Sequence, residues 1–208
     1  MKRNIVITIA RQYGSGGRTV GEMLANDLGI HYYDHELIHL ASEESGISLG
    51  LFLDADERVR NTGFFKTPVN VYKGELIGPD SKEFTSEANL FNYQAKVIKR
   101  LAETTSCVIV GRCADYVLRD MDALFSVFLT SPAEIRAERV AMRAGISIEE
   151  AAELIEKKDK ARSEYYNYYT FGDWGFAASY DLCIDSSILG IEGTTDFIID
   201  FAKKAGII

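Results

Sequence analysis

The sequence predicts an α/β fold, in which a parallel β-sheet is covered by helices on both faces. Short apolar runs recur along the chain and are separated by longer segments with helical spacing, which is the pattern that such a sheet produces. The chain has 208 residues, of which 47% are hydrophobic and 26% are charged. This length and composition predict that residues 1–208 form a single globular domain.

The first apolar run begins a strand–helix–strand unit, with strands expected at residues 5–9 and 31–33. Gly29 stands where the C-terminus of a helix favours a left-handed residue. The helix between the strands is predicted by four apolar residues on one stripe, which are Val20, Met23, Leu24 and Leu28.

Further strands are expected at residues 107–110, 124–129 and 182–184. A long helix is predicted over residues 87–103, because its apolar residues recur on one stripe. A last helix is predicted over residues 195–204, where two lysines lie near the negative end of its dipole.

Two more helices are predicted from Ser-x-x-Glu capping patterns, which begin at Ser131 and at Ser147. Proline in the first turn, at Pro132, strengthens the first of them. Residues 49–84 break the alternation with glycines and prolines among aromatic and charged side chains. Long insertions in compact domains are usually functional, so we interpret this one as a region that covers a substrate.

The net charge of −8 argues against nucleic acid as a general partner, because such binding usually needs a basic excess. No apolar stretch approaches the ~18 residues needed to span a membrane. The three cysteines, Cys107, Cys113 and Cys183, lack a C-x-x-C zinc pattern. We therefore expect a cytoplasmic protein that binds no nucleic acid and no membrane.

A glycine-rich turn follows the first strand and leads into the first helix, with the sequence Gly14-Ser15-Gly16-Gly17-Arg18-Thr19. Glycines allow positive φ, so successive backbone N–H groups can point at one anion. The helix N-terminus adds unpaired N–H groups and the positive end of its dipole. This order of elements predicts a phosphate-binding loop.

The turn departs from the G-x-x-x-x-G-K-[ST] pattern at two of its four positions. Gln12 takes the place of the first glycine, and Arg18 takes the place of the lysine. Arg18 keeps the positive charge but presents a planar fork instead of a compact ammonium group. Thr19 keeps the hydroxyl group that is the natural ligand for Mg²⁺.

Residues that follow the strands are further candidates, because ligands of open α/β sheets bind beyond the carboxyl ends of the strands. Asp34 follows the second strand and either orients a phosphate acceptor, holds a metal-bound water or caps the next helix. Arg112 follows the third strand and either grips an acceptor phosphate or forms a surface salt bridge.

A basic stretch and an aromatic stretch complete the candidates. Arg136, Arg139 and Arg143 recur at helical spacing, and basic residues also end the next predicted helix. The two helices therefore form either a lid over the nucleotide or a solvated charged surface. The basic residues of that second helix are Lys157, Lys158, Lys160 and Arg162. An aromatic run follows, from Tyr165 to Tyr169 and then Trp174. These side chains either stack on a base or pack in the core.

Several of these segments, in the same order, resemble the cytidylate kinase-like family of P-loop proteins. They are Arg11-Gln12-Tyr13-Gly14-Ser15-Gly16-Gly17-Arg18, Tyr33-Asp34, Val108-Ile109-Val110-Gly111-Arg112, Asp159-Lys160-Ala161-Arg162 and the aromatic run before Trp174. The resemblance implies a three-layer P-loop fold with a five-stranded parallel sheet in the order 2-3-1-4-5. It also implies an acceptor-binding insertion at about residues 35–90 and a lid at about residues 136–175.

The activity that the resemblance implies is phosphoryl transfer from ATP, with Mg²⁺, to CMP or dCMP, by a monomer or homodimer. Arg112 matches the Gly-Arg that contacts the acceptor in the family, and Asp159 with Arg162 matches an Asp-x-x-Arg in its lid region. We expect these three residues to bind the substrate together with Asp34. In this reading Arg18 cradles the donor phosphates, Asp34 orients the acceptor, and Arg139 and Arg143 neutralise charge on the transferring group.

Two alternatives remain open at this point. The changes at Gln12 and Arg18 suit a regulatory protein that binds a nucleotide without turnover. The second alternative is a kinase that phosphorylates a non-nucleotide small molecule, because the same fold serves several acceptors.

Overall fold

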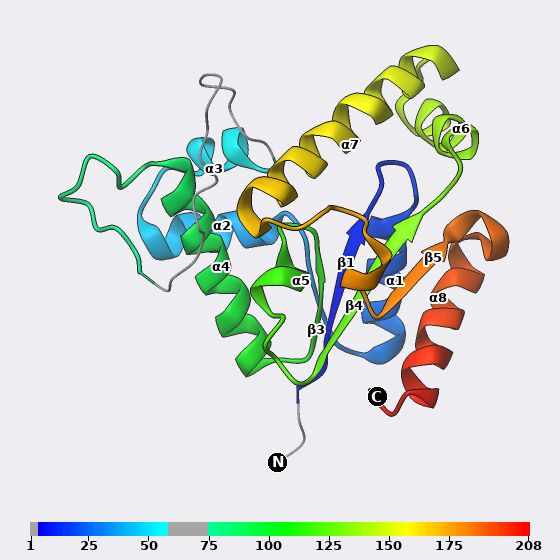
Figure 1. The fold of residues 1–208 in the computed structure, drawn as a ribbon, viewed down its shortest axis with the longest axis horizontal. Helices are drawn as coiled ribbons and strands as arrows, with labels where there is room; N and C mark the ends of the chain where they lie inside the picture. The colour runs from blue at the N-terminus through cyan, green and yellow to red at the C-terminus, as the bar shows by residue number, and fades with distance from the viewer. Residues whose placement is uncertain (1–3, 58–74) are drawn as a thin grey trace.

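A computed structural model describes residues 4–57 and 75–208, which form a three-layer α/β domain around one parallel sheet (Figure 1). The order β2-β3-β1-β4-β5 confirms the order that the resemblance implied. The strands are β1 (Val6–Arg11), β2 (His31–Tyr33), β3 (Cys107–Val110), β4 (Leu124–Thr130) and β5 (Leu182–Asp185), each within two residues of its predicted bounds.

Side chains of the central strands alternate between two apolar cores, one on each face of the sheet. In β1, Val6 points into one core, whereas Ile7 and Ile9 point into the other. In β3, Ile109 and Val110 divide in the same way. This alternation is the period-2 geometry of a strand buried on both faces, and it explains why the predicted strands are continuously apolar.

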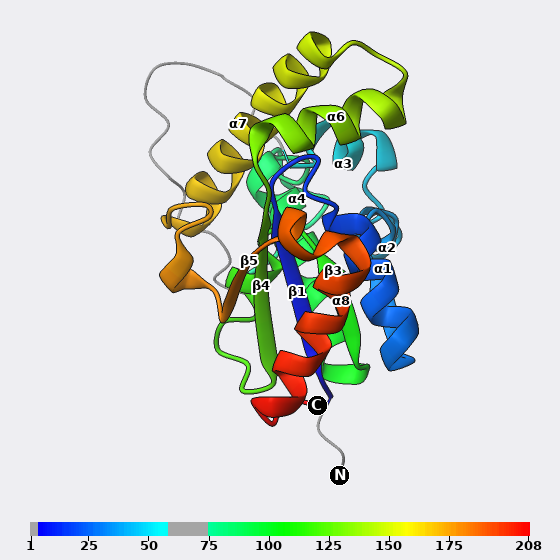
Figure 2. The ribbon, with the colours of Figure 1, turned by 90° about the vertical axis from the view of Figure 1, so that its right-hand side faces the viewer.

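Two helices, α1 (Gly17–Leu28) and α8 (Ser186–Lys204), cover one face of the sheet (Figure 2). The other face is covered by α2 (Glu36–Ser45), α3 (Leu49–Ala55), α4 (Glu87–Thr104) and the short α5 (Ala114–Val117). The predicted helix at residues 87–103 is therefore confirmed as α4. Among residues 4–57 and 75–208, none of the helices combines the length and the apolar composition of a membrane-spanning segment.

The remaining helices, α6 (Ala133–Ala144) and α7 (Ile148–Thr170), pack on each other beyond the carboxyl ends of the strands (Figures 1 and 2). Gly145, with φ 66°, ends α6. Ser147 and Glu150 form the predicted capping box of α7, in which each side chain accepts from the other residue's backbone N–H. We call α6 and α7 the helical hairpin.

Three local predictions are corrected. Ser131 does not cap α6, because Pro132 takes the cap position without a side-chain bond, and the Ser131 hydroxyl has no partner among the described residues. The last helix begins at Ser186, nine residues earlier than predicted, with a non-helical Gly190 inside it. The basic residues expected to end the second lid helix lie within α7, which continues to Thr170.

The expected insertion at residues 49–84 contains α3, and its residues 58–74 lie outside the described ranges.

Candidate functional site

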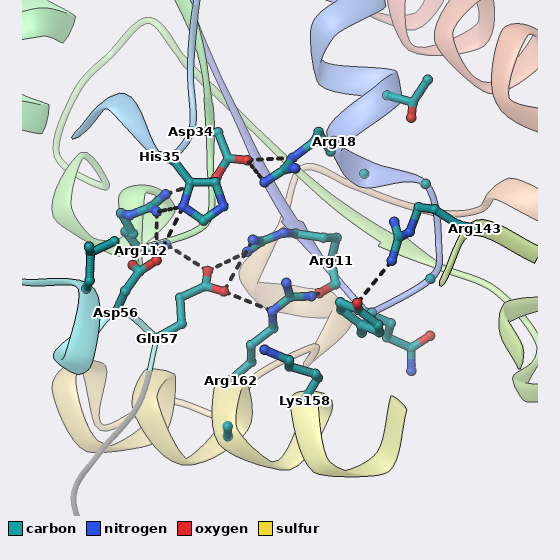
Figure 3. A pocket seen from close by; sticks show the side chains of 18 residues that line it. Arg11, Arg18, Asp34, His35, Asp56, Glu57, Arg112, Arg143, Lys158 and Arg162 are labelled. Carbon is teal, nitrogen blue, oxygen red and sulfur yellow. Dashed lines mark hydrogen bonds and ion pairs between the residues drawn. The ribbon is translucent and has the colours of Figure 1, made fainter. Parts of the chain in front are cut away.

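The glycine-rich turn joins the end of β1 to the start of α1, as predicted (Figure 3). Gly14 and Gly16 have φ of 84° and 87°, in the left-handed region that favours glycine. A Cβ atom at Gly16 would overlap the side chain of Ile191, and one at Gly17 would lie 2.7 Å from Cγ of Arg11. The loop thus has the conformation and the close packing that only glycine permits.

The first residues of α1, Gly17, Arg18 and Thr19, line a cavity of about 660 Å³, and their backbone N–H groups have no partner within the helix. The hydroxyl group of Thr19 lines this cavity, is exposed and makes no hydrogen bond within the described residues, so it suits a Mg²⁺ ligand. Of the predicted site residues, the cavity is lined by Gly14, Gly16, Gly17, Arg18, Thr19, Asp34, Arg112, Arg143 and Arg162.

Asp34 connects two of the predicted arginines. Its carboxylate accepts from Nε of Arg18 at 2.9 Å and from Nη1 of Arg112 at 3.1 Å. Burial alone would raise the pKa of Asp34, but the charge of Arg112, then that of Arg11, lowers it below the ordinary value. Asp34 is therefore an ionised group that orients two guanidinium groups, and it does not cap α2, whose cap position is His35.

Arg112 is 2% exposed, so the alternative of a surface salt bridge is wrong. The tight turn after β3 positions it, because Gly111, Arg112 and Cys113 all have positive φ. Nη2 of Arg112 donates to Asp56 at 3.0 Å, in addition to the bond with Asp34. Burial disfavours its charge, but the carboxylates that face it outweigh this and raise the pKa of Arg112.

Glu57 bridges two further arginines of the cavity. Its Oε1 accepts from Nη1 of Arg11 at 2.6 Å, and its Oε2 accepts from Nε of Arg162 at 2.9 Å. Burial would raise the pKa of Glu57, but Arg11, Arg162 and Arg112 together hold it well below the ordinary value. The cavity thus contains alternating arginines and carboxylates, which Figure 3 displays as one connected network.

The helical hairpin is tied to the backbone of the glycine loop at Tyr13. Asp159 of α7 accepts from the backbone N–H of Tyr13 at 2.6 Å and from Nη1 of Arg136 at 2.5 Å. Arg136 of α6 also donates to the carbonyl oxygen of Tyr13, and Arg143 donates to its hydroxyl group at 3.0 Å. The predicted Asp159 therefore holds the loop in place and does not line the cavity.

Two other predicted residues also lie outside the cavity lining. Arg139 donates to Oγ and to the carbonyl oxygen of Ser186, at 3.0 and 3.3 Å. Ser15 is fully buried, and its hydroxyl group donates to the carbonyl oxygen of Gln12. Ser186 in turn donates to the carbonyl oxygen of Ser15 at 2.6 Å, so these residues brace the loop against the start of α8.

Gln12, at the place of the first glycine in the phosphate-loop pattern, bonds to the end of β4. Its Oε1 accepts from the hydroxyl group of Thr130 at 2.5 Å and from the backbone N–H of Ser131 at 3.3 Å. The side chain therefore anchors the loop to the neighbouring strand. This contact gives a structural reason for glutamine at a position where the usual pattern has glycine.

Sequence reasoning did not select Arg11, Asp56 and Glu57 as site residues. Arg11 ends β1, so the rule that selected Arg112 would also have found Arg11. Asp56 and Glu57 follow α3, and nothing in their local sequence indicates the cavity. The one available signal was charge balance, because several arginines at one sheet edge need carboxylate partners.

The aromatic run packs in the core. Tyr165, Tyr166 and Tyr169 are buried, and the ring of Tyr169 stacks on Phe91 with 4.2 Å between centroids. Trp174 meets Phe128 edge to face. Of the two readings of this run, the geometry supports packing between α7 and α4.

The chain matches a family model described as the cytidylate kinase-like family over residues 6–188. A cytidylate kinase of Pyrococcus abyssi is 30% identical over 191 residues, which are 91% of this chain and 88% of that protein. A cytidylate kinase of Pyrococcus horikoshii is 29% identical over 194 residues, which are 92% of this chain and 85% of that protein.

Two solved structures share the fold. An uncharacterized protein from Eubacterium ventriosum is 27% identical, with a TM-score of 0.71 and coverage of 96% of this chain and 99% of that chain. A shikimate kinase from Bacteroides thetaiotaomicron is 15% identical, with a TM-score of 0.55 and coverage of 96% and 98%. At that identity the second likeness concerns the fold alone.

Proposed function

Because the chain belongs to the cytidylate kinase-like family, we propose that it is a nucleoside monophosphate kinase that transfers the γ-phosphoryl group of ATP to CMP or dCMP. The observation that carries the proposal is that a glycine loop and five arginines, of which Arg112 is buried, line one cavity at the carboxyl edge of the sheet. Phosphoryl transfer depends mainly on positioning and on neutralising charge, which N–H groups and guanidinium groups provide.

The donor side of the cavity is the glycine loop together with the N-terminus of α1, whose N–H groups suit the β and γ phosphates. Arg143 and Lys158 line the same cavity, and neither pairs with a carboxylate within residues 4–57 and 75–208. No carboxylate neutralises either cation there, so both suit a polyphosphate. Mg²⁺ bound at Thr19 would neutralise charge on the donor phosphates.

The acceptor side consists of Arg112 and Arg162, which line the cavity together with Asp34. A guanidinium group contacts two oxygens of one phosphate group, so these arginines suit the phosphate of a nucleoside monophosphate. Asp34 stays ionised and fixes the orientation of Arg112 and Arg18. In this proposal it positions the arginines and does not itself transfer a proton.

The helical hairpin positions the donor loop through Tyr13. Asp159 and Arg136 hold the backbone of Tyr13, whereas Arg143 is the hairpin arginine that faces the transferring group. Arg139 binds Ser186, so its role in this proposal is to support the loop. A closing motion of residues 136–175 remains part of the proposal, because lids exclude water from phosphoryl transfer.

The test is ADP formation by purified protein with Mg²⁺ and ATP, measured with nucleoside monophosphates and with small alcohols that carry no phosphate. We expect turnover that requires CMP or dCMP. Arg18→Ala is expected to weaken ATP binding, and Arg112→Ala is expected to weaken monophosphate binding. Turnover with an alcohol and with no monophosphate would show that the acceptor is a non-nucleotide small molecule. Absence of acceptor-dependent ADP formation in every mixture would refute the proposal that the protein is a kinase.

Binding without turnover is the second candidate, because Arg18 stands at the lysine position and is held by Asp34 at 2.9 Å. A guanidinium group anchored in this way has less freedom to follow the transferring phosphate than a lysine ammonium group. Calorimetric titration separates the two functions. Tight ATP binding together with absence of ADP formation would favour this candidate over the kinase.

A further inference from the structure

The carboxylate of Glu57 lies between Arg11 and Arg162, of which the proposed function assigns Arg162 to the acceptor phosphate (Figure 3). It contacts both Arg11 and Arg162, and Oε1 also accepts from the backbone N–H of Arg112 at 3.4 Å. Two guanidinium groups and one backbone N–H are the donors that a bound phosphate group would use. Glu57 therefore makes the same type of contacts that a phosphate would make.

The backbone of Glu57 is held in an unfavourable conformation. Its φ is 49°, in the left-handed region that a residue with a long side chain rarely adopts. The side chain packs against Gly111, where a Cβ atom would overlap both Glu57 and Arg11. The ion pairs thus keep Glu57 in a position that its backbone disfavours, and release of the side chain would relieve this strain.

Charge also explains why an anion is needed between these arginines. Burial lowers the pKa of Arg162, and the neighbouring positive charge of Arg11 lowers it further. A carboxylate between the two guanidinium groups offsets this repulsion. A dianionic phosphate has more charge and more acceptor oxygens, so it would offset the repulsion better than one carboxylate.

We propose that Glu57 is a specificity-determining residue, which occupies the acceptor-phosphate position and yields it only to a ligand whose phosphate group contacts both Arg11 and Arg162. Neutral ligands such as a nucleoside cannot replace the carboxylate, because they leave the two arginines without an anion. The inference rests on the proposed function for its assignment of the acceptor side. It adds a built-in competitor that makes the site select for phosphate.

The variant Glu57→Gln removes the charge and keeps the size of the side chain. Glu44→Gln is the matched control, because Glu44 also bridges two cations, Lys96 and Arg100, and has the same 16% side-chain exposure as Glu57. Glu44 does not line the cavity. Calorimetric titrations of wild type and both variants with inorganic phosphate, CMP and cytidine, at one pH and one ionic strength, test the proposal.

We expect Glu57→Gln to bind inorganic phosphate and CMP about tenfold more tightly than wild type, because the carboxylate that competes for Arg11 and Arg162 is lost. Cytidine affinity should not change, and Glu44→Gln should behave as wild type. Equal or weaker phosphate binding by Glu57→Gln, or none at all, would overturn the proposal, because Glu57 would then organise the arginines instead of competing for them.

A measurement on wild type covers the case in which Glu57→Gln does not fold. Hydrogen exchange at the backbone amides of residues 53–57 should become faster when phosphate or CMP saturates the protein, because Glu57 is released. Slower exchange or no change there would contradict the proposal. Neither experiment requires turnover, so a failure of the kinase assay and a failure of this inference give different results.

Discussion

Nη1 of Arg112 lies 3.1 Å from Oδ1 of Asp34, although the two residues are 78 positions apart in the chain. Each follows a different strand, Asp34 after β2 and Arg112 after β3, and these strands are parallel neighbours in the sheet. The carboxyl ends of neighbouring parallel strands lie side by side, so the topology itself produces this pair. The pair links Arg112, on the proposed acceptor side of the cavity, to Arg18 of the glycine loop.

Arg112→Ala is expected to lower the free energy of unfolding by about 3 kcal/mol, because Asp34 and Asp56 are left without their buried partner. The Michaelis constant for CMP should rise while that for ATP stays nearly constant. Chemical denaturation and steady-state kinetics measure the two effects. The control is Arg119→Ala, which removes an exposed pair with Asp120 worth about 0 to 1 kcal/mol. Equal stability of the two variants would contradict the role assigned to Arg112.

Gly16→Ala is expected to weaken ATP binding and to destabilise the protein. Its φ of 87° costs a non-glycine residue about 1 kcal/mol, and the new methyl group would overlap Ile191. Gly29→Ala is the matched control, because Gly29 also has positive φ, at 63°, but has no neighbour within 4 Å of a Cβ atom. A titration with ATP that finds both variants alike would show that the loop conformation does not matter.

Asp159→Asn is expected to raise the Michaelis constant for ATP through the position of Tyr13. The substitution removes the counter-ion of Arg136, whose side chain is 9% exposed, at a cost of about 3 kcal/mol. Asp181→Asn serves as control, since Asp181 binds Ser126 and does not line the cavity. If both variants lose stability but neither changes the ATP constant, Asp159 has no part in holding the donor loop.

Asp115→Asn is expected to stabilise the protein above about pH 6. Burial raises the pKa of Asp115 to about 6, although the hydroxyl group of Tyr166 bonds to its carboxylate and opposes this. The folded state therefore keeps a proton that the unfolded state has lost, and Asp115 reduces stability as the pH rises from about 4 to 6.

Asparagine accepts the same hydrogen bond from Tyr166 without the buried charge. The gain of the variant should be near zero below about pH 4 and roughly 2 to 3 kcal/mol at pH 7. Thermal or chemical denaturation across this pH range measures it. A gain that does not depend on pH would mean that Asp115 does not titrate in this window.

The sequence by itself determined the sheet, the glycine loop, and the placement of Asp34 and Arg112 at the carboxyl edge. These features depend on apolar runs, turn residues and the rule of parallel strands, all of which are written in short stretches of consecutive residues. Ser147 capped its helix as predicted, since its partner Glu150 lies within one turn. Ser131 did not cap α6, because Pro132 takes the cap position and the backbone N–H of Ser131 donates to Gln12, 119 positions away.

Only the tertiary structure decided which charges meet. Glu57 reaches Arg11 across 46 positions and Arg162 across 105, and Asp159 reaches Tyr13 across 146. Arg139 and Arg143 lie about one turn apart on α6, but Arg139 binds Ser186 and Arg143 lines the cavity. The residues next to a charged side chain in the sequence do not indicate which opposite charge it will meet. That partner is decided by the packing of segments that lie far apart in the chain.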